Sequence, residues 1–263
     1  RRLPYGQEVN GRLSNSGRST EANCIAPISS GLRSDRSRRD RLGCMRNKSA
    51  TPSLVVLVVS YGVAAIPFSG ALARFLRGVD LRDTGSGTVS GTGLYRVAGL
   101  GPLIVGGVLD VAKGSVGTLL AGRDRPVLQA LAAGVAVAGH NWSPFLGGAG
   151  GRGLSPTLGA LLVPAPEGSA VLLSGLTIGK LAGATSIGAL AADGLLIPFL
   201  CRTRGTRGAL LGTAVVVPML AKRVLGNQPP RDPGRLRIYA SRLVFDQDEP
   251  AVPAWWPGGA TAP

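Results

Sequence analysis

One stretch of the chain concentrates the residue types that could bind an anion. Residues 139–156 contain the only histidine, His140, together with six glycines, no acidic residue and one cation, Arg152. Glycines let the backbone turn its amides toward a ligand, and a cation beside a helix start adds positive charge where helix amides are unpaired. This composition predicts a phosphate or oxyanion pocket at a membrane surface. The alternative is a flexible interhelical loop whose arginine contacts lipid headgroups.

A second stretch, residues 85–96, has a similar composition. It alternates glycines with serine and threonine hydroxyls and ends in an arginine, Arg96. Amides, hydroxyls and a fork-shaped guanidinium suit phosphate, so this is a second candidate anion cradle. It is not a Walker loop, because no Gly-Lys-Ser/Thr closes it, nor a dinucleotide fingerprint, because no strand is expected before it.

Two charges interrupt a long apolar segment between these stretches. Asp110 and Lys113 lie three residues apart, hence on one face of a helix, and can pair with each other. Ionisable groups at membrane depth are costly and usually face a polar cavity or mark the aqueous end of a helix. The sequence therefore predicts either a structural ion pair or charges that line a cavity.

Apolar segments must position these groups. Residues 53–73 form an uncharged run of 21 residues, and as a helix such a run crosses about 30 Å of hydrocarbon. Further apolar segments occupy residues 97–122, 127–138, 153–163, 169–179, 181–200 and 208–221. The expected fold class is an all-α integral membrane protein with about seven transmembrane or partly spanning helices and two glycine-rich cytoplasmic loops. The segments at 153–163 and 169–179 are too short to span alone, which favours tilted or half-depth helices beside a cavity.

The charge pattern separates a membrane domain from two polar tails. The 263 residues carry a net charge of +15, but the basic residues crowd the first 50 positions and the region after Arg202. Membrane orientation and anionic lipids account for this distribution, and no nucleic-acid partner is expected. Residues 1–50, with eleven Lys/Arg against four Asp/Glu, are typical of a disordered basic tail, with Met45 as the expected natural start. Residues 51–225 are the expected membrane domain, and residues 226–263 a polar, proline-rich cytoplasmic tail.

The cysteines bear on disulfide and metal sites, and the charges in the loops bear on the orientation of the chain in the membrane. Cys24, Cys44 and Cys201 are odd in number and have no metal-ligand spacing, so neither a disulfide framework nor a metal site is expected. Basic residues after the first segment (Arg74, Arg77 and Arg82) place that loop in the cytoplasm, and alternation puts residues 139–156 on the same side. The same alternation places residues 202–207 outside despite their arginines, which suggests a re-entrant or miscounted late segment.

Four short motifs follow one another over residues 61–187. They are Ile66-Pro67-Phe68-Ser69-Gly70 with Ala73-Arg74; Gly85-Ser86-Gly87 with Arg96; Leu109-Asp110-Val111-Ala112-Lys113-Gly114; and Gly139-His140-Asn141-Trp142-Ser143-Pro144-Phe145-Leu146-Gly147 followed by Gly150-Gly151-Arg152-Gly153. In type and order they resemble the motifs of the acyl-phosphate:glycerol-3-phosphate acyltransferases of bacterial membranes, the PlsY type.

The resemblance implies a reaction and a set of site residues. A fatty acyl group would pass from acyl phosphate to the 1-hydroxyl of glycerol 3-phosphate, giving lysophosphatidic acid for phospholipid synthesis, at the cytoplasmic face of the plasma membrane, without metal, cofactor or acyl-CoA. Expected catalytic residues are Ser86, Arg96, His140 and Arg152, and expected substrate-binding residues are Gly85, Gly87, Thr88, Lys113, Asn141, Gly150, Gly151, Gly153 and Ser186. His140 is a candidate general base oriented by Asp110, or it braces its loop through backbone hydrogen bonds.

Departures from the family pattern keep two other functions open. Thr88 and Gly93 stand where the first motif has asparagines, and no histidine follows Lys222, so the third motif is unrecognisable. These departures favour a divergent paralogue with another acceptor or no activity. The third hypothesis is a small-solute transporter, which the charges at membrane depth favour and the lack of a visible inverted repeat disfavours.

Overall fold

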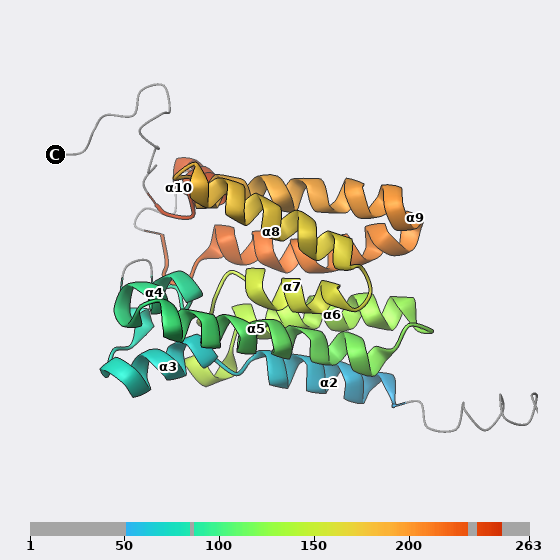
Figure 1. Ribbon diagram of the computed structural model, residues 1–263, viewed down its shortest axis with the longest axis horizontal. Helices are drawn as coiled ribbons and strands as arrows, with labels where there is room; N and C mark the ends of the chain where they lie inside the picture. The colour runs from blue at the N-terminus through green and yellow to red at the C-terminus, as the bar shows by residue number, and fades with distance from the viewer. Residues whose placement is uncertain (1–50, 85–86, 231–235, 249–263) are drawn as a thin grey trace, which may run out of the picture. The chain divides into compact units, whose positions relative to one another are not determined.

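The computed structural model describes residues 51–84, 87–230 and 236–248, and in these ranges it contains helices and turns but no strand (Figure 1). The α-helices are α2 (Ser53–Ala64), α3 (Phe68–Arg77), α4 (Gly91–Ala98), α5 (Leu100–Ala121), α6 (Pro126–Asn141), α7 (Leu154–Leu162), α8 (Pro166–Leu181), α9 (Thr185–Leu225) and α10 (Leu236–Phe245). Three helical segments, Ser53–Arg77, Leu100–Ala121 and Thr185–Leu225, are long and apolar enough to cross a membrane. The expected all-α membrane fold is confirmed, and each predicted apolar segment forms helix.

The first membrane segment is broken between α2 and α3 at Pro67. Proline has no N–H and cannot continue a helix, so carbonyl groups before it lose their helical partners. Two of them find side-chain donors from distant parts of the chain: Lys113 Nζ donates to Ile66 O at 2.6 Å, and Ser143 Oγ donates to Ala65 O at 2.6 Å. The break is therefore a junction at which α5 and the second glycine-rich stretch are attached to the first segment.

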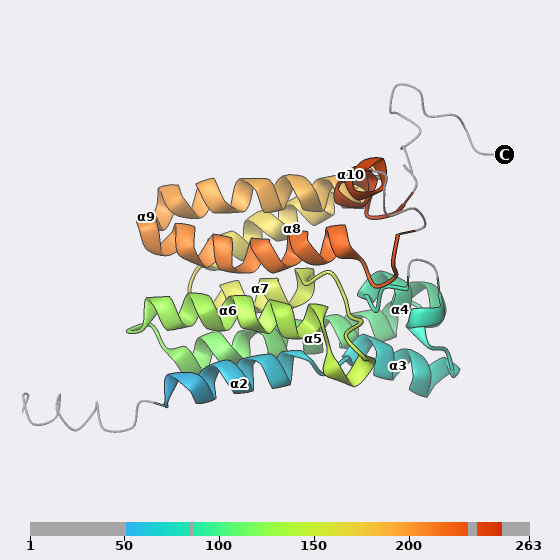
Figure 2. The ribbon, with the colours of Figure 1, turned by 180° about the vertical axis from the view of Figure 1, so that it is seen from behind.

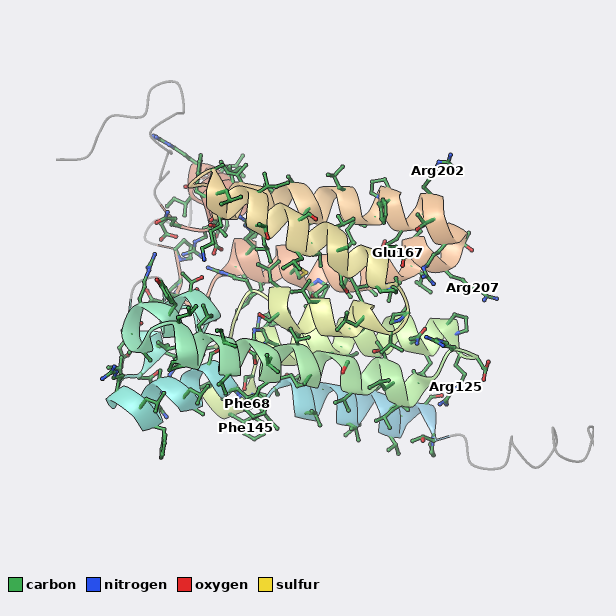
Figure 3. All side chains as sticks on the ribbon, in the orientation of Figure 1. Phe68, Arg125, Phe145, Glu167, Arg202 and Arg207 are labelled. Carbon is green, nitrogen blue, oxygen red and sulfur yellow. The ribbon has the colours of Figure 1, made fainter. Side chains whose placement is uncertain are left out.

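The last two predicted segments, residues 181–200 and 208–221, correspond to the two halves of α9 on either side of Gly205, which we call its arms. Gly205 interrupts the helix with φ +63°, a left-handed conformation that glycine tolerates, and the arms fold back on each other (Figures 1 and 2). Arg202 and Arg207 flank this turn, at the end of the bundle away from α3 and α4 (Figures 1 and 3). Strict alternation therefore holds through both arms, and the expectation of a re-entrant or miscounted late segment is wrong.

Helices α5 and α7 cross with their backbones in contact. A β-carbon on Gly114 would lie 2.1 Å from Pro156 O, and one on Gly159 would lie 1.8 Å from Val111 O. The nine residues of α7 span only roughly 14 Å at 1.5 Å per residue, which agrees with the expected half-depth helix. This close crossing sets the end of the second glycine-rich stretch beside the turn of α5 that carries Asp110 and Lys113.

The core and the outer surface of the bundle differ in the expected way. The largest core cluster joins α6, α7, α8 and both arms of α9 through fully buried side chains (Val137, Leu161, Leu172, Leu196 and Val215). Large apolar side chains also cover the outside, among them Leu54, Val108 and Ile178, which are 62–72% exposed. An apolar exterior of this extent suits contact with lipid tails.

Two helices form where the sequence predicts none. The second half of the predicted loop at residues 85–96 is α4, in which Ser90 Oγ accepts a hydrogen bond from Gly93 N and Leu94 is fully buried. The cap and the buried leucine outweigh the low helix propensity of glycine. Helix α10 lies in the predicted polar tail and packs against α9. Residues 1–50, with the predicted start at Met45, lie outside the described residues.

Candidate active site

The two glycine-rich stretches meet at the end of the bundle that carries α3, α4 and α10 (Figure 1). Val89 N donates directly to Gly150 O at 3.1 Å. Asn227, which follows α9, bridges the stretches: its Nδ2 donates to Gly87 O and Gly150 O, both at 2.9 Å, and its Oδ1 accepts from Gly150 N at 3.1 Å. The expected convergence of the two stretches is confirmed.

Asn227 is a residue that the sequence analysis missed. It lies in the segment assigned to the polar tail, immediately after Gly226, whose φ of +68° ends α9. Its three hydrogen bonds reach residues 77 and 140 positions away along the chain, and no local pattern predicts such contacts. The one available signal is an asparagine directly after a helix-ending glycine.

A small cavity lies where the two stretches approach α3, α5 and α6. It is lined by Ala65, Pro67, Phe68, Ser69, Val89, Asp110, Lys113, His140, Leu146, Gly150 and Gly151. Its volume is about 10 Å³, which is room for about one water molecule. A phosphate group can enter this cavity only if the neighbouring backbone moves apart.

Asp110 and Lys113 form the predicted ion pair inside this cavity. Lys113 Nζ lies 2.8 Å from Asp110 Oδ1, and the two side chains are 2% and 5% exposed. Ser69 Oγ donates to Asp110 Oδ2 at 3.1 Å, and the Lys113 ammonium lies 5.6 Å from the centre of the Phe68 ring. Both predictions for these charges, the pair and the cavity, are confirmed.

His140 packs against the backbone of the second stretch. A β-carbon on Gly151 would lie 2.1 Å from His140 Nε2, so a larger residue there would displace the ring. The imidazole makes no hydrogen bond to any residue that the structure describes, and Asp110 binds Lys113 and Ser69 instead. Neither the expected orienting carboxylate nor the expected backbone brace is therefore present, and the ring lines the cavity without a hydrogen-bond partner among the described residues.

The glycines of the second stretch allow close backbone packing. Gly150 N donates to Asn227 Oδ1, and Gly151 N donates to His140 O at 3.3 Å. These two amides are thus occupied rather than turned toward a ligand. Gly153 adopts φ +82° immediately before α7, where a β-carbon would lie 2.7 Å from Val137 Cγ1.

Arg152 belongs to a separate basic cluster, which we define as Arg152, Lys222 and Arg223. Arg152 Nη1 donates to Lys222 O at 2.9 Å, and its Nε lies 2.8 Å from the Asp246 carboxylate at the end of α10. Lys222 Nζ donates to Gly148 O at 3.3 Å. Sequence reasoning missed Lys222 and Arg223, because cations near a helix end look like ordinary interfacial charges.

Arg223 connects the basic cluster to Ser186 and to α10. Its Nη2 donates to the backbone carbonyls of Ser186 and Val244. Ser186 therefore lies beside the basic cluster and not at the cavity, which α3, α5, α6 and the two stretches enclose. Asn141 is buried, and its Nδ2 donates to Pro218 O at 2.9 Å, which fixes the end of α6 on α9.

The remaining predicted site residues belong to the first stretch. Arg96 lies in the last turn of α4 with an exposed side chain, and neither the cavity lining nor the ion pairs of the described residues include it. Thr88 is buried, and Gly87 has φ +66°. Gly85 and Ser86 lie outside the described residues. Arg96, an expected catalytic residue, therefore does not line the cavity.

An acidic residue orients two arginines in the segment before the first stretch. Asp80 accepts hydrogen bonds from Arg74 and Arg82, and the contacts with Arg82 hold the pKa of the Asp80 carboxyl well below its usual range. Arg82 Nη1 also donates to Leu146 O at 3.4 Å. The Asp80 carboxylate thus orients a cation that links the segment before the first stretch to the second stretch.

Comparison with known proteins identifies relatives. Residues 54–225 match the family described as Glycerol-3-phosphate acyltransferase. The chain is 47% identical over 115 residues to glycerol-3-phosphate acyltransferase 2 of Moorella thermoacetica, covering 43% of this chain and 59% of that protein. It is 33% identical over 193 residues to a glycerol-3-phosphate acyltransferase of Synechococcus sp. (strain CC9902), covering 68% of this chain and 94% of that protein.

A solved structure has a similar fold. The crystal structure of PlsY (YgiH), an integral membrane glycerol 3-phosphate acyltransferase in its glycerol 3-phosphate form, superposes with a TM-score of 0.60 at 24% sequence identity. The superposition covers 65% of this chain and 88% of that one. The likeness concerns the fold, and the family match ends at residue 225, before Asn227 and α10.

Proposed function

We propose that this chain, which belongs to the glycerol-3-phosphate acyltransferase family, transfers a fatty acyl group from an acyl phosphate to the 1-hydroxyl of glycerol 3-phosphate. The products are lysophosphatidic acid and phosphate. The observation that carries the proposal is the meeting of two glycine-rich stretches over a cavity that holds Lys113 and His140, next to the basic cluster around Arg152. Two phosphate-bearing substrates need positive charge of this kind beside lipid.

The reaction needs little chemistry from the protein. The hydroxyl oxygen attacks the acyl carbon, the bond from that carbon to the phosphate oxygen breaks, and the phosphate leaves with the electron pair. The hydroxyl proton passes to a phosphate oxygen or to the free imidazole of His140. Because acyl phosphate is already activated, positioning and charge neutralisation supply most of the acceleration. In this proposal Arg96, Arg152 and Lys113 hold phosphate groups.

The direct test is a product assay. Purified protein given acyl phosphate and radiolabelled glycerol 3-phosphate is expected to release lysophosphatidic acid. Arg96→Ala and Arg152→Ala are each expected to lower turnover at least about tenfold with the helical content unchanged, since each removes a positive charge that this proposal assigns to a substrate phosphate. Normal turnover in both variants would remove the two arginines from the site. No product from the unaltered protein would favour the divergent paralogue, and solute counterflow in liposomes would favour the transporter.

We also propose that the end of the bundle with the glycine-rich stretches faces the cytoplasm of the plasma membrane. Arg74 and Arg77 on α3 and Arg82 after it support this orientation, because short cytoplasmic loops are enriched in Lys and Arg. The turn of α9 with Arg202 lies at the opposite end and then faces outward (Figure 3).

Cys201, which is exposed at this turn, is a native reporter of orientation. In intact cells that express a Cys24→Ser/Cys44→Ser variant, a membrane-impermeant maleimide is expected to label Cys201 from outside. A variant that also carries Cys201→Ser is the control and should take up no label. Labelling that requires cell lysis would reverse the proposed orientation.

A further inference from the structure

A carboxylate lies on the arginine of the second glycine-rich stretch. Asp246 follows directly after α10, and its Oδ1 lies 2.8 Å from Arg152 Nε. The residue has φ +62°, and its N–H donates to Arg242 O at 3.0 Å, so the end of the helix fixes the direction of the side chain. Helix α10 follows the residues that match the family, which end at residue 225.

The surroundings of Asp246 hold more positive than negative charge. Besides Arg152, the basic cluster contains Lys222, which is 1% exposed, and Arg223, which is 6% exposed. Arg223 donates to Val244 O, two residues before Asp246, and also faces the buried carboxylate of Asp193. Two carboxylates thus compensate three cations, and the excess positive charge favours an incoming anion.

The contact between Asp246 and Arg152 is close but poorly satisfied. Arg152 Nε, Arg223 Nε and Asp246 Oδ1 are buried, and none of the three has a hydrogen bond of good geometry within the described residues. Burial raises the pKa of the Asp246 carboxyl, so its charged form is held there at a cost in solvation. A phosphate monoester, with three acceptor oxygens and a charge of about −2 at neutral pH, satisfies such donors better.

We propose that Asp246 occupies a phosphate position on Arg152 while substrate is absent and competes with the phosphate group of a substrate for that position. The inference rests on the proposed function, in which Arg152 holds a phosphate. Asp246 takes no part in the transfer, and it sets the apparent affinity. Its side chain is 28% exposed, so an anion from solvent can reach and displace it.

The opposite role for Asp246 would be to hold Arg152 in a productive orientation. The two roles predict changes of opposite sign in KM. Removal of a competitor lowers KM, because a larger fraction of the protein is ready to bind. Removal of a support raises KM, because Arg152 loses its position.

The test is the Asp246→Asn variant, which keeps the size of the side chain and suits the left-handed backbone of this position. The KM for a phosphate substrate is expected to fall about five- to tenfold, as for a site that is blocked most of the time, while kcat changes less than twofold. Whichever KM falls, that for glycerol 3-phosphate or that for acyl phosphate, identifies the phosphate that displaces Asp246.

A matched control lies two residues further on. Asp248 binds Arg242, so Asp248→Asn is expected to leave both KM values unchanged. A KM that rises or stays constant in Asp246→Asn would overturn the proposal.

A binding measurement separates this proposal from the proposed function. Inorganic phosphate is expected to raise the thermal stability of Asp246→Asn at concentrations about five- to tenfold lower than for the unaltered protein. This measurement requires no turnover. If Asp246→Asn binds phosphate more tightly but the protein makes no lysophosphatidic acid, the result would support competition by Asp246 and contradict the proposed reaction. If both proteins need the same phosphate concentration for the same stabilisation, the result would overturn the proposed competition.

Discussion

Lys113→Met is expected to destabilise the protein by about 3–5 kcal/mol, because it leaves the buried Asp110 carboxylate without its cation. The ion pair is almost fully enclosed, with side chains 2% and 5% exposed. The substitution also removes the donor to Ile66 O, so the break between α2 and α3 loses one of its two side-chain partners. Thermal unfolding of the purified protein in detergent measures the effect.

The double variant Asp110→Asn/Lys113→Met separates folding from function. It removes both charges and keeps an oxygen to accept the hydrogen bond from Ser69 Oγ. Replacing both partners of a buried pair with neutral groups is often nearly neutral for stability. We therefore expect the double variant to regain most of the stability that Lys113→Met loses. We expect both variants to lack turnover, because both lack the Lys113 charge. Full turnover in the double variant would exclude a role for Lys113 in holding substrate, and a stable single variant would contradict the assigned energetics.

Gly159→Ala is expected to cost about 3 kcal/mol or more, because the new β-carbon would lie 1.8 Å from Val111 O. The obstacle is backbone, so relief requires α5 and α7 to separate. Separation would move the turn that carries Lys113 away from the first segment, and activity is expected to fall together with stability. Unfolding temperature and turnover of the same preparation provide the measurement.

Gly107→Ala is the matched control for this substitution. Gly107 lies on α5, and a β-carbon there meets no atom within 4 Å. Alanine is favoured over glycine in a helix by about 1 kcal/mol, so this variant is expected to keep or slightly increase stability. Equal losses in both variants would show that the close crossing of α5 and α7 does not depend on its glycines.

The membrane segments and the ion pair could be predicted because they depend on local properties of the sequence. An uncharged run of sufficient length specifies a membrane helix wherever it occurs. The spacing of Asp110 and Lys113 places both on one helix face and so specifies their contact. The meeting of the two glycine-rich stretches followed from alternation of the segments across a membrane.

The contacts of the polar segments could not be predicted, because they depend on partners far away in the sequence. In the sequence, Asn227 and Asp246 look like residues of a polar tail. In the structure, the end of α9 places Asn227 against both glycine-rich stretches, and the end of α10 places Asp246 on Arg152. Helix α4 was missed because its glycines lower helix propensity, whereas burial of Leu94 stabilises it. His140 could be recognised as a candidate. Its lack of a hydrogen-bond partner could not be predicted, because it arises from the contacts of Asp110 with Lys113 and Ser69.

The interruption at Pro67 has a consequence for biosynthesis. In the hydrocarbon phase an unpaired carbonyl is costly. Ile66 O has a local donor in Phe68 N at 3.1 Å, whereas the side-chain donors to Ala65 O and Ile66 O come from Ser143 and Lys113, 78 and 47 residues later in the chain. The nascent first segment therefore enters the bilayer before its eventual partners have been made. The side-chain hydrogen bonds that attach the break to the rest of the bundle therefore form only after the later segments have entered the bilayer.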